Sequence, residues 1–240
     1  GDWSSDVCSS DLQKTLNTYG IPESGMAEIL QESDIPIDVH LAWLPQVGRV
    51  DIRLYGENTE SISEAKATVY QKLGRYIWSE DTDEPSELLI HLLRTHKLSI
   101  SVAESCTGGL MQKMLTDIKG ASDVFKGGVV TYHNDAKQQL LHVKGETLHS
   151  HGAVSPDVAL EMVKGLQASF GTNIAVSITG IAGPDGGTAE KPIGTVYFGF
   201  AVGTEVWHSS NLFTGDRSSI RFKAAESAIL QLVRYLKGRQ

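Results

Sequence analysis

The amino-acid sequence predicts an α/β protein, with a three-layer domain in the C-terminal part of the chain and a smaller α+β domain before it. Three observations support this prediction. The composition, 40% hydrophobic and 21% charged, is typical of globular proteins. An acidic stretch without hydrophobic residues, 79–87, marks a boundary between two domains. Beyond it, segments with strand and helix periodicity alternate along the chain, which is typical of layered α/β domains.

We therefore expect three regions. Residues 1–12 are rich in Ser and Asp and show neither helical nor strand periodicity. We interpret them as a disordered or non-native terminus, and the alternative is an ordinary frayed end. Residues 13–82 are expected to form the small α+β domain, and residues 83–240 the α/β domain.

In residues 13–82, the segment from Glu23 to Gln31 has the pattern of a short helix. Apolar residues alternate over 37–43 and again over 50–54, which predicts two half-buried strands joined by a turn. Apolar residues then recur at helical spacing over 62–77. These elements predict a βαβ-like or ββα pair of layers.

The larger domain is expected to alternate strands and helices. Ser155, Pro156 and Asp157 are typical of a helix start, because Ser caps free N–H groups, Pro fits the first position and Asp favours the positive end. The expected helices are 88–95, 107–118, 134–142, 155–166 and 216–236, and the expected strands are 98–103, 127–132, 174–179 and 195–202.

Charge and cysteine content exclude several classes of protein. The 240 residues include 29 acidic and 21 basic side chains, a net charge of −8, which lacks the electrostatic footprint of a general nucleic-acid binder. No run of about 18 apolar residues occurs, so we expect no membrane span. Two cysteines without a C-x-x-C motif exclude a disulfide scaffold and a cysteine-rich zinc site. No signal peptide is visible, so we expect a cytoplasmic protein.

The first candidate site is the segment 103–109, where Ser105, Thr107, Gly108 and Gly109 follow a buried-looking strand and open a helix. Such a turn lies at the carboxyl edge of the sheet, where open α/β sheets bind ligands. Free N–H groups of a helix start can hold an oxyanion or a phosphate, and glycine lets a ligand approach the backbone. The alternative is that Ser105 or Thr107 merely caps the helix.

The second candidate site is the segment 132–137, which also joins a strand end to a helix start. Lys137 lies one turn into that helix. A lysine acts as a base only when it is neutral, so its pKa must be lowered by burial or by a neighbouring cation. The hydroxyl of Tyr132 could hydrogen-bond this amine and hold it in place. The alternative is an ordinary exposed helix lysine.

The third candidate site is a glycine-rich stretch that follows a predicted strand. A strand rather than a helix comes next, so the stretch is not a dinucleotide-binding fingerprint. Glycine density at a strand end suggests backbone donors that face a ligand, and the alternative is a long mobile hairpin loop. The residues concerned are Thr179, Gly180, Gly183, Gly186 and Gly187.

Metal binding is not expected. His142, His149 and His151 are close in sequence, but no H-E-x-x-H pattern and no zinc-deaminase pattern occurs.

Together these segments resemble the C-terminal domain of the CinA family, the nicotinamide-nucleotide amidohydrolases. The resemblance extends over nearly all of 86–236 and rests on several motifs that occur in order along the chain. The matching segments are 103–109, 130–137, 151–155, 177–187, 194–196 and 215–217.

The resemblance implies hydrolysis of the carboxamide of nicotinamide mononucleotide to nicotinate mononucleotide and ammonia, without metal or cofactor. It implies that Ser105 is the nucleophile and Lys137 the base, with Tyr132 and Thr179 positioning the base and relaying its proton. It also implies an α/β/α sandwich with a mixed sheet, and a homodimer. The residues expected to bind substrate are Thr107, Gly108, Gly109, Ser122, Gly180, Gly183, Gly186, Gly187 and Arg217.

Cys106 is the alternative nucleophile, because a thiolate is intrinsically more reactive than a hydroxyl. Successive residues at a helix start point about 100° apart, so Ser105 and Cys106 cannot both face one substrate carbon.

Residues 13–82 resemble the KH-type middle domain of long CinA proteins, whose large N-terminal domain this sequence does not include. KH modules clamp nucleic acid with a G-x-x-G loop, which is lacking here. The segment also holds 11 acidic and six basic residues, a net charge of −5. We therefore expect a spacer or assembly domain without a nucleic-acid partner. The alternative function for the whole chain is a non-catalytic nucleotide-binding or scaffold module of a competence/damage-inducible CinA protein.

Overall fold

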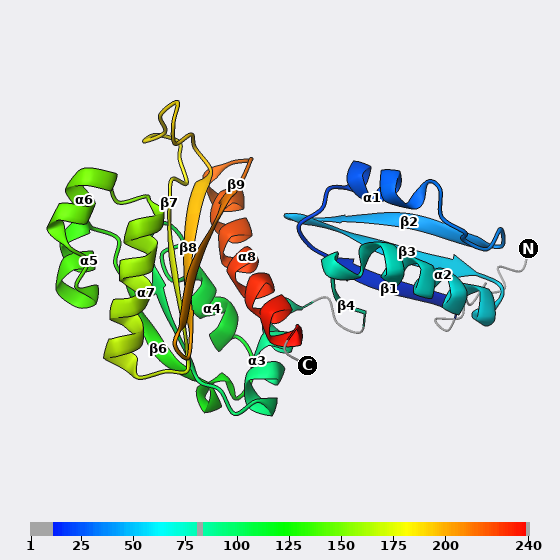
Figure 1. The fold of residues 1–240 in the computed structure, drawn as a ribbon, viewed down its shortest axis with the longest axis horizontal. Coiled ribbons are helices and arrows are strands. Elements are labelled where there is room, and N and C mark those ends of the chain that lie inside the picture. Colours follow the sequence, from blue (N-terminus) through cyan, green and yellow to red (C-terminus); the bar gives the residue numbers. More distant parts are fainter. Residues whose placement is uncertain (1–11, 81–83, 239–240) are drawn as a thin grey trace, which may run out of the picture. The chain divides into compact units, whose positions relative to one another are not determined.

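The computed structural model describes residues 12–80 and 84–238 (Figure 1). The chain divides into two compact units, residues 1–83 and residues 84–240. Apart from Leu12, the terminus predicted over 1–12 lies outside the described residues. No helix in the described part of the chain is both long enough and apolar enough to cross a membrane.

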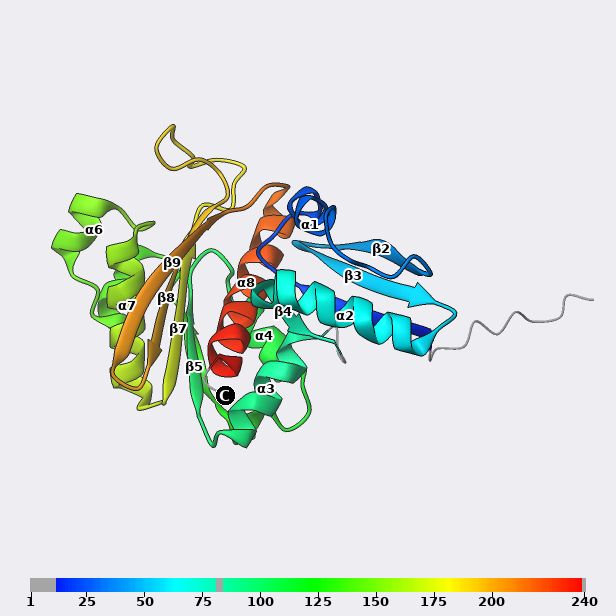
Figure 2. The same ribbon diagram turned by 45° about the vertical axis from the view of Figure 1, so that its right-hand side comes forward.

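The small unit is a four-stranded antiparallel sheet with two helices on one face. The strands lie in the order β2-β3-β1-β4, which is the split βαβ arrangement. Leu16 and Ile52 of the sheet share a buried cluster with Met26 and Val69, which come from the two helices. Both helices therefore cover the same face (Figure 2). The elements are β1 (Gln13–Thr18), α1 (Glu23–Leu30), β2 (Val39–Gln46), β3 (Arg49–Gly56), α2 (Thr59–Leu73) and β4 (Ile77–Ser79).

Most elements expected for the small unit are confirmed, namely both helices and the hairpin of β2 and β3. Two expectations are corrected. Ile37 is fully exposed and precedes β2, and α2 ends at Leu73 because Ile77 already belongs to β4. The sequence pattern did not reveal β1, which is mostly polar at its start, or β4, which has three residues.

The large unit is built on a five-stranded sheet with the order β6-β5-β7-β8-β9. β5 pairs in parallel with β6 and β7, whereas β8 is antiparallel to both β7 and β9. The predicted mixed sheet is therefore confirmed. The strands are β5 (Ile100–Glu104), β6 (Phe125–Val130), β7 (Ile174–Gly180), β8 (Thr195–Val202) and β9 (Glu205–Leu212).

Helices cover both faces of this sheet, which gives the three predicted layers (Figure 2). One layer holds α3, α4 and α8, and the other holds α5, α6 and α7. Gly165 of α7 lets α5 approach closely, because a Cβ there would lie 1.9 Å from the carbonyl oxygen of Leu141. The helices are α3 (Pro85–Thr95), α4 (Leu110–Thr116), α5 (Asn134–Leu141), α6 (Gly145–His151), α7 (Pro156–Phe170) and α8 (Arg217–Lys237).

The start of α7 is confirmed: the Oγ of Ser155 accepts the N–H of Val158 at 3.2 Å, and Pro156 is the first helical residue. The helix expected over 107–118 is shorter, because positive φ angles at Gly108 and Gly109 delay α4 until Leu110. The strand expected over 127–132 begins and ends two residues earlier, and α6 and β9 were not expected.

Candidate active site

Three strands place the candidate residues at one edge of the sheet. Glu104 ends β5 and pairs with Val130 of β6 and Ile178 of β7. Just beyond it, the N–H of Ser105 donates to the carbonyl of Ile178 at 2.9 Å. On the other side, the N–H of Thr131 donates to the carbonyl of Glu104 at 2.8 Å. The residues that follow β5, β6 and β7 therefore meet at their shared carboxyl edge, as expected for parallel strands.

Ser105 and Lys137 form a buried pair at this edge. Lys137 lies one turn into α5, and its side chain reaches back to the sheet. Its Nζ lies 3.0 Å from the Oγ of Ser105 and 2.9 Å from the carbonyl oxygen of Thr131. Only 1% of Lys137 and 8% of Ser105 is exposed. The tertiary fold thus joins two residues that the sequence analysis singled out separately, and Lys137 is not an ordinary exposed helix lysine.

Burial lowers the pKa of Lys137 below its ordinary value of 10.5, because an ammonium group loses its hydration there. Negative charge on Cys106 acts in the opposite direction, and burial is the larger of the two causes. The neutral amine keeps a lone pair that can accept the hydroxyl proton of Ser105, while its N–H donates to the carbonyl of Thr131. The environment therefore favours the form of lysine that can act as a base.

Cys106 is placed less favourably for nucleophilic chemistry. It is 7% exposed, and burial raises the pKa of its thiol to about 12. The reactive thiolate is therefore scarce near neutral pH.

Tyr132 and Thr179 do not hold the lysine as expected. The ring of Tyr132 is 58% exposed, and its hydroxyl accepts a hydrogen bond from Nη2 of Arg217 at 2.6 Å. The hydroxyl of Thr179 is buried beside the site but donates to the carbonyl of Ala153 at 2.7 Å. The expectation that these side chains hydrogen-bond Lys137 is wrong, because the backbone carbonyl after β6 already occupies that place.

Ser122 does not belong to this site. It is exposed in the 3₁₀ helix Ala121–Asp123, which precedes the start of β6. The candidate site lies beyond the other end of β6, about 20 Å away along a six-residue strand. The expectation that Ser122 lines the site is therefore wrong, because strand direction separates the two ends.

Four N–H groups at the start of α4 and just before it already have acceptors within the protein. The carboxylate of Glu104 is fully buried and accepts the N–H groups of Gly109 at 2.9 Å, Met111 at 3.2 Å and Gln112 at 2.8 Å. The N–H of Gly108 donates to the carbonyl of Ser105 at 3.1 Å. An internal carboxylate thus occupies the anion site that the helix start was expected to offer to a phosphate. Gly108 and Gly109 serve the turn, whose positive φ angles suit glycine.

Arg221 of α8 holds the same turn through hydrogen bonds to two backbone carbonyls. Its Nε donates to the carbonyl of Cys106 at 3.2 Å, and its Nη2 donates to the carbonyl of Thr107 at 2.7 Å. In a trans peptide the N–H points opposite to the C=O, so this clamp directs the N–H of Thr107 away from α8. Glu104 and Arg221 were not identified as site residues from the sequence. The position of Glu104 at the end of a predicted buried strand could have indicated its role. No sequence pattern indicated the role of Arg221.

We expect Arg221→Met to lower kcat of any reaction that uses Ser105 by roughly 10²-fold with little change in KM, because losing the hydrogen bonds to the carbonyls of Cys106 and Thr107 misaligns the backbone next to Ser105. Arg221→Lys should not restore kcat, since one ammonium cannot match the fork of a guanidinium. Steady-state kinetics measure the effect. Arg234→Met, on the same helix, is the matched control. An unchanged kcat in Arg221→Met would contradict the positioning role.

The predicted glycine-rich site is the loop 181–194 between β7 and β8. Close packing explains most of the glycines here. At the end of β7, a Cβ on Gly180 would lie 2.7 Å from Val196, and in the loop, Cβ atoms on Gly183 and Gly187 would each lie 2.9 Å from Ile193. Gly186 has a φ of 91°, and a Cβ there would make an ordinary van der Waals contact with Ile181 at 3.8 Å.

Arg217 anchors one end of this loop. It is the first residue of α8, after the N-cap residue Asp216, whose Oδ1 accepts the N–H of Ser219 at 2.7 Å. Nη1 of Arg217 donates to the carbonyl of Gly183 at 2.6 Å while Nη2 holds Tyr132. Arg217 therefore bridges the loop and the end of β6.

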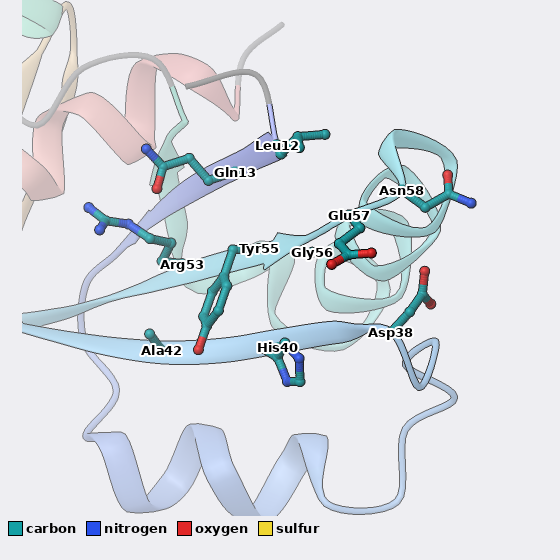
Figure 3. Close-up of a pocket in the computed structure, with 10 residues that line it drawn as sticks. All are labelled: Leu12, Gln13, Asp38, His40, Ala42, Arg53, Tyr55, Gly56, Glu57 and Asn58. Atoms are coloured by element: carbon teal, nitrogen blue, oxygen red, sulfur yellow. The ribbon is translucent and has the colours of Figure 1, made fainter. Parts of the chain in front are cut away.

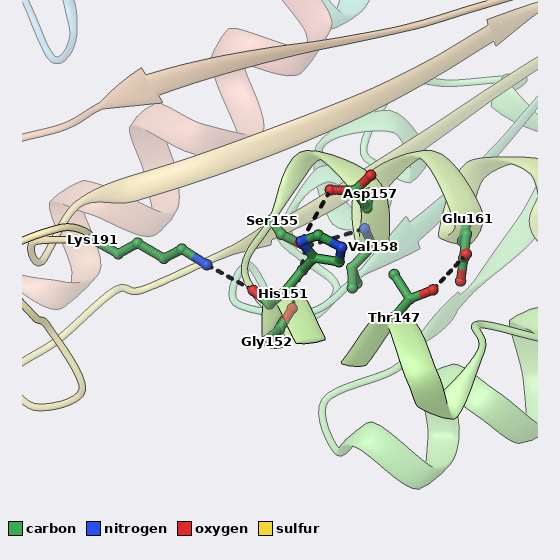
Figure 4. A network of polar contacts seen from close by, with 8 residues as sticks. All are labelled: Thr147, His151, Gly152, Ser155, Asp157, Val158, Glu161 and Lys191. Atoms are coloured by element: carbon green, nitrogen blue, oxygen red, sulfur yellow. Dashed lines mark hydrogen bonds and ion pairs between the residues drawn. The ribbon is translucent and has the colours of Figure 1, made fainter. Parts of the chain in front are cut away.

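A polar network around α6 and α7 anchors the other end of the loop (Figure 4). Nζ of Lys191 donates to the carbonyl of His151 at 2.8 Å, and Nδ1 of His151 lies 3.7 Å from Asp157. Glu161 of α7 accepts a hydrogen bond from Thr147 of α6 at 2.8 Å. Among the described residues, no three His, Cys, Asp or Glu side chains gather in a way that could hold a metal ion.

The fold and this edge define an α/β protein with a buried, lysine-paired serine at the end of a mixed sheet. The chain belongs to the CinA family. The family model described as the CinA C-terminal domain matches residues 82–236, and the model described as the damage-inducible protein CinA KH domain matches residues 13–79.

Curated relatives are similar over nearly the whole chain. A CinA-like protein of Syntrophomonas wolfei is 42% identical over 234 residues, which is 94% of this chain and 56% of the relative. A CinA-like protein of Thermotoga maritima is 39% identical over 233 residues, 95% of this chain and 57% of the relative. The chain thus spans little more than half the length of the curated relatives it matches.

Solved structures match about two thirds of the chain. A competence/damage inducible protein from Agrobacterium tumefaciens is 40% identical with a TM-score of 0.62, covering 65% of this chain and 97% of that one. The competence damage-inducible protein A from Klebsiella pneumoniae is 33% identical with a TM-score of 0.63, covering 66% of this chain and all of that one.

Proposed function

We propose that this chain hydrolyses the carboxamide of nicotinamide mononucleotide to nicotinate mononucleotide and ammonia. The observation that carries the proposal is the Ser105–Lys137 pair: a hydroxyl 3.0 Å from a buried amine whose pKa is lowered. A lysine of this kind can activate a serine without a metal or a histidine. The substrate is the one that the resemblance to amidohydrolases of the family implies.

The reaction proceeds by acyl transfer. The Oγ of Ser105 attacks the amide carbon while its proton passes to the neutral Nζ of Lys137. The N–H of Thr107 stabilises the developing oxyanion. The ammonium form of Lys137 then protonates the amide nitrogen, which leaves as ammonia, and an ester remains on Ser105. Lys137 next takes a proton from water, the hydroxide hydrolyses the ester, and the proton returns to the Oγ of Ser105.

Ammonia release from nicotinamide mononucleotide by the purified chain tests the proposal. We expect the unmodified chain to release ammonia and nicotinate mononucleotide in equal amounts. Binding of the mononucleotide without ammonia release would instead support the alternative, a non-catalytic nucleotide-binding or scaffold module of a longer CinA protein.

We further propose that the substrate phosphate binds at the turn 183–187, with Arg217 beside it. The start of α4 does not fit this role, because Glu104 already accepts N–H groups of Gly109, Met111 and Gln112. We expect kcat/KM for nicotinamide riboside, which lacks the phosphate, to be lower than for the mononucleotide by roughly 10²-fold, since charge-assisted hydrogen bonds are lost. Equal values of kcat/KM for the two substrates would rule out a phosphate site.

A homodimer and a cytoplasmic location stay predictions that the resemblance and the sequence imply. The mass of the chain in solution, measured by light scattering, tests the first of them.

A further inference from the structure

The helix-free face of the small sheet carries an ordered row of polar and aromatic side chains. On β3 and just beyond it, Arg53, Tyr55 and Glu57 follow each other at every second residue, so they share this face. On β2 the partners of Arg53 and Tyr55 are Ala42 and His40. Along this face, the basic Arg53 is therefore followed by the aromatic pair Tyr55 and His40 and then by the acidic Glu57.

These side chains line a hollow with a volume of about 980 Å³ (Figure 3). Asp38 lies at the acidic end with Glu57, because the next pair along the strands is Val39 with Gly56. Gln13 of β1 lies on the opposite side of Tyr55, to which it is paired. The volume falls at the upper end of the range found for small-molecule sites.

Two features of the hollow point to a ligand. The rings of His40 and Tyr55 lie 5.4 Å apart, and 42% of Tyr55 is exposed, so a flat ring can stack there. Arg53 lines the hollow on the basic side of Tyr55. Its guanidinium stays charged, and its N–H groups can donate charge-assisted hydrogen bonds to an anion in the hollow.

We propose that this hollow binds a mononucleotide whose base carries an exocyclic amino group. The base stacks on Tyr55 and His40, and its amino group donates to Asp38 or Glu57. The ribose lies over Ala42, whose small side chain leaves room. The phosphate reaches Arg53.

A mononucleotide fits better than an RNA strand. Stacking of bases on aromatic residues of an open four-stranded sheet is the mode used by RNA-recognition modules. Here, however, residues 13–82 carry a net charge of −5, and two carboxylates lie at one end of the hollow. A strand of phosphates would pass those carboxylates, whereas a single phosphate meets only Arg53.

Calorimetric titration of the full chain with AMP tests the proposal. We expect Tyr55→Leu to weaken AMP binding at least tenfold and Tyr55→Phe, which keeps the ring, to leave it unchanged. Arg53→Met should weaken AMP binding until its affinity equals that of adenosine for the unmodified chain. Arg75→Met, which changes an arginine over Tyr76 in the same unit, is the matched control. IMP, which has a carbonyl in place of the amino group, should bind at least tenfold more weakly than AMP.

The test separates this site from the proposed active site, because Tyr55→Leu should leave ammonia release from nicotinamide mononucleotide unchanged. AMP binding that is equal in Tyr55→Leu and Tyr55→Phe would overturn the proposal. So would a single-stranded RNA oligonucleotide that binds more tightly than AMP with a steep salt dependence, which would favour an RNA surface.

Discussion

Ser105→Ala is expected to lower kcat for nicotinamide mononucleotide by at least about 10⁴-fold, because alanine has no oxygen to form the ester intermediate. Cys106→Ala should retain most of the activity. The thiol is buried with a pKa raised to about 12, so it offers almost no thiolate at neutral pH. Ammonia release by the two variants measures the contrast.

Binding provides the control for this pair. Both variants should still bind the mononucleotide, which separates a missing nucleophile from a disturbed fold. Activity that survives in Ser105→Ala and disappears when a small alkylating reagent modifies Cys106, with protection by substrate, would assign the nucleophile to the cysteine instead.

Lys137→Met is expected to lower kcat by roughly 10²- to 10⁴-fold, the range typical for loss of a general base. Lys137→Arg should be equally inactive, because guanidinium stays protonated.

In the unmodified chain, kcat/KM should rise with pH through one ionisation below 10.5, since burial lowers the pKa of Lys137 and only the neutral amine accepts the serine proton. Activity in Lys137→Arg, or a flat profile while chemistry limits the rate, would mean that another group takes this proton.

The same lowered pKa predicts how stability depends on pH. Above 10.5 the lysine is neutral in both folded and unfolded chains and has no effect. As pH falls from 10.5 to the folded pKa, the unfolded chain binds the proton first, so the free energy of unfolding decreases; below the folded pKa the loss is constant. Lys137→Met should therefore be at least as stable as the unmodified chain near neutral pH, and any advantage should vanish as pH approaches 10.5. Denaturant unfolding at several pH values measures this, and a variant that is less stable throughout would contradict it.

Local patterns in the sequence determined much of the fold. Apolar periodicity located α2, α7 and α8 and the central strands, because these segments bury one face or both in a core. It missed β1, β4 and β9, which are short or polar and depend on neighbouring strands for their hydrogen bonds. Ser105 and Lys137 were also found from the sequence, since each follows the end of a predicted strand.

Only the tertiary structure decided which groups meet at the site. Lys137 is held by the backbone carbonyl of Thr131, and a backbone carbonyl leaves no trace in residue identity. Glu104 takes the helix-start N–H groups, and Arg221 reaches the same turn from a helix more than 100 residues further along the chain. Ser122 lies at the wrong end of β6 because strand direction, not distance along the sequence, sets which edge a residue occupies. These contacts join segments that are remote in sequence, so no local pattern encodes them.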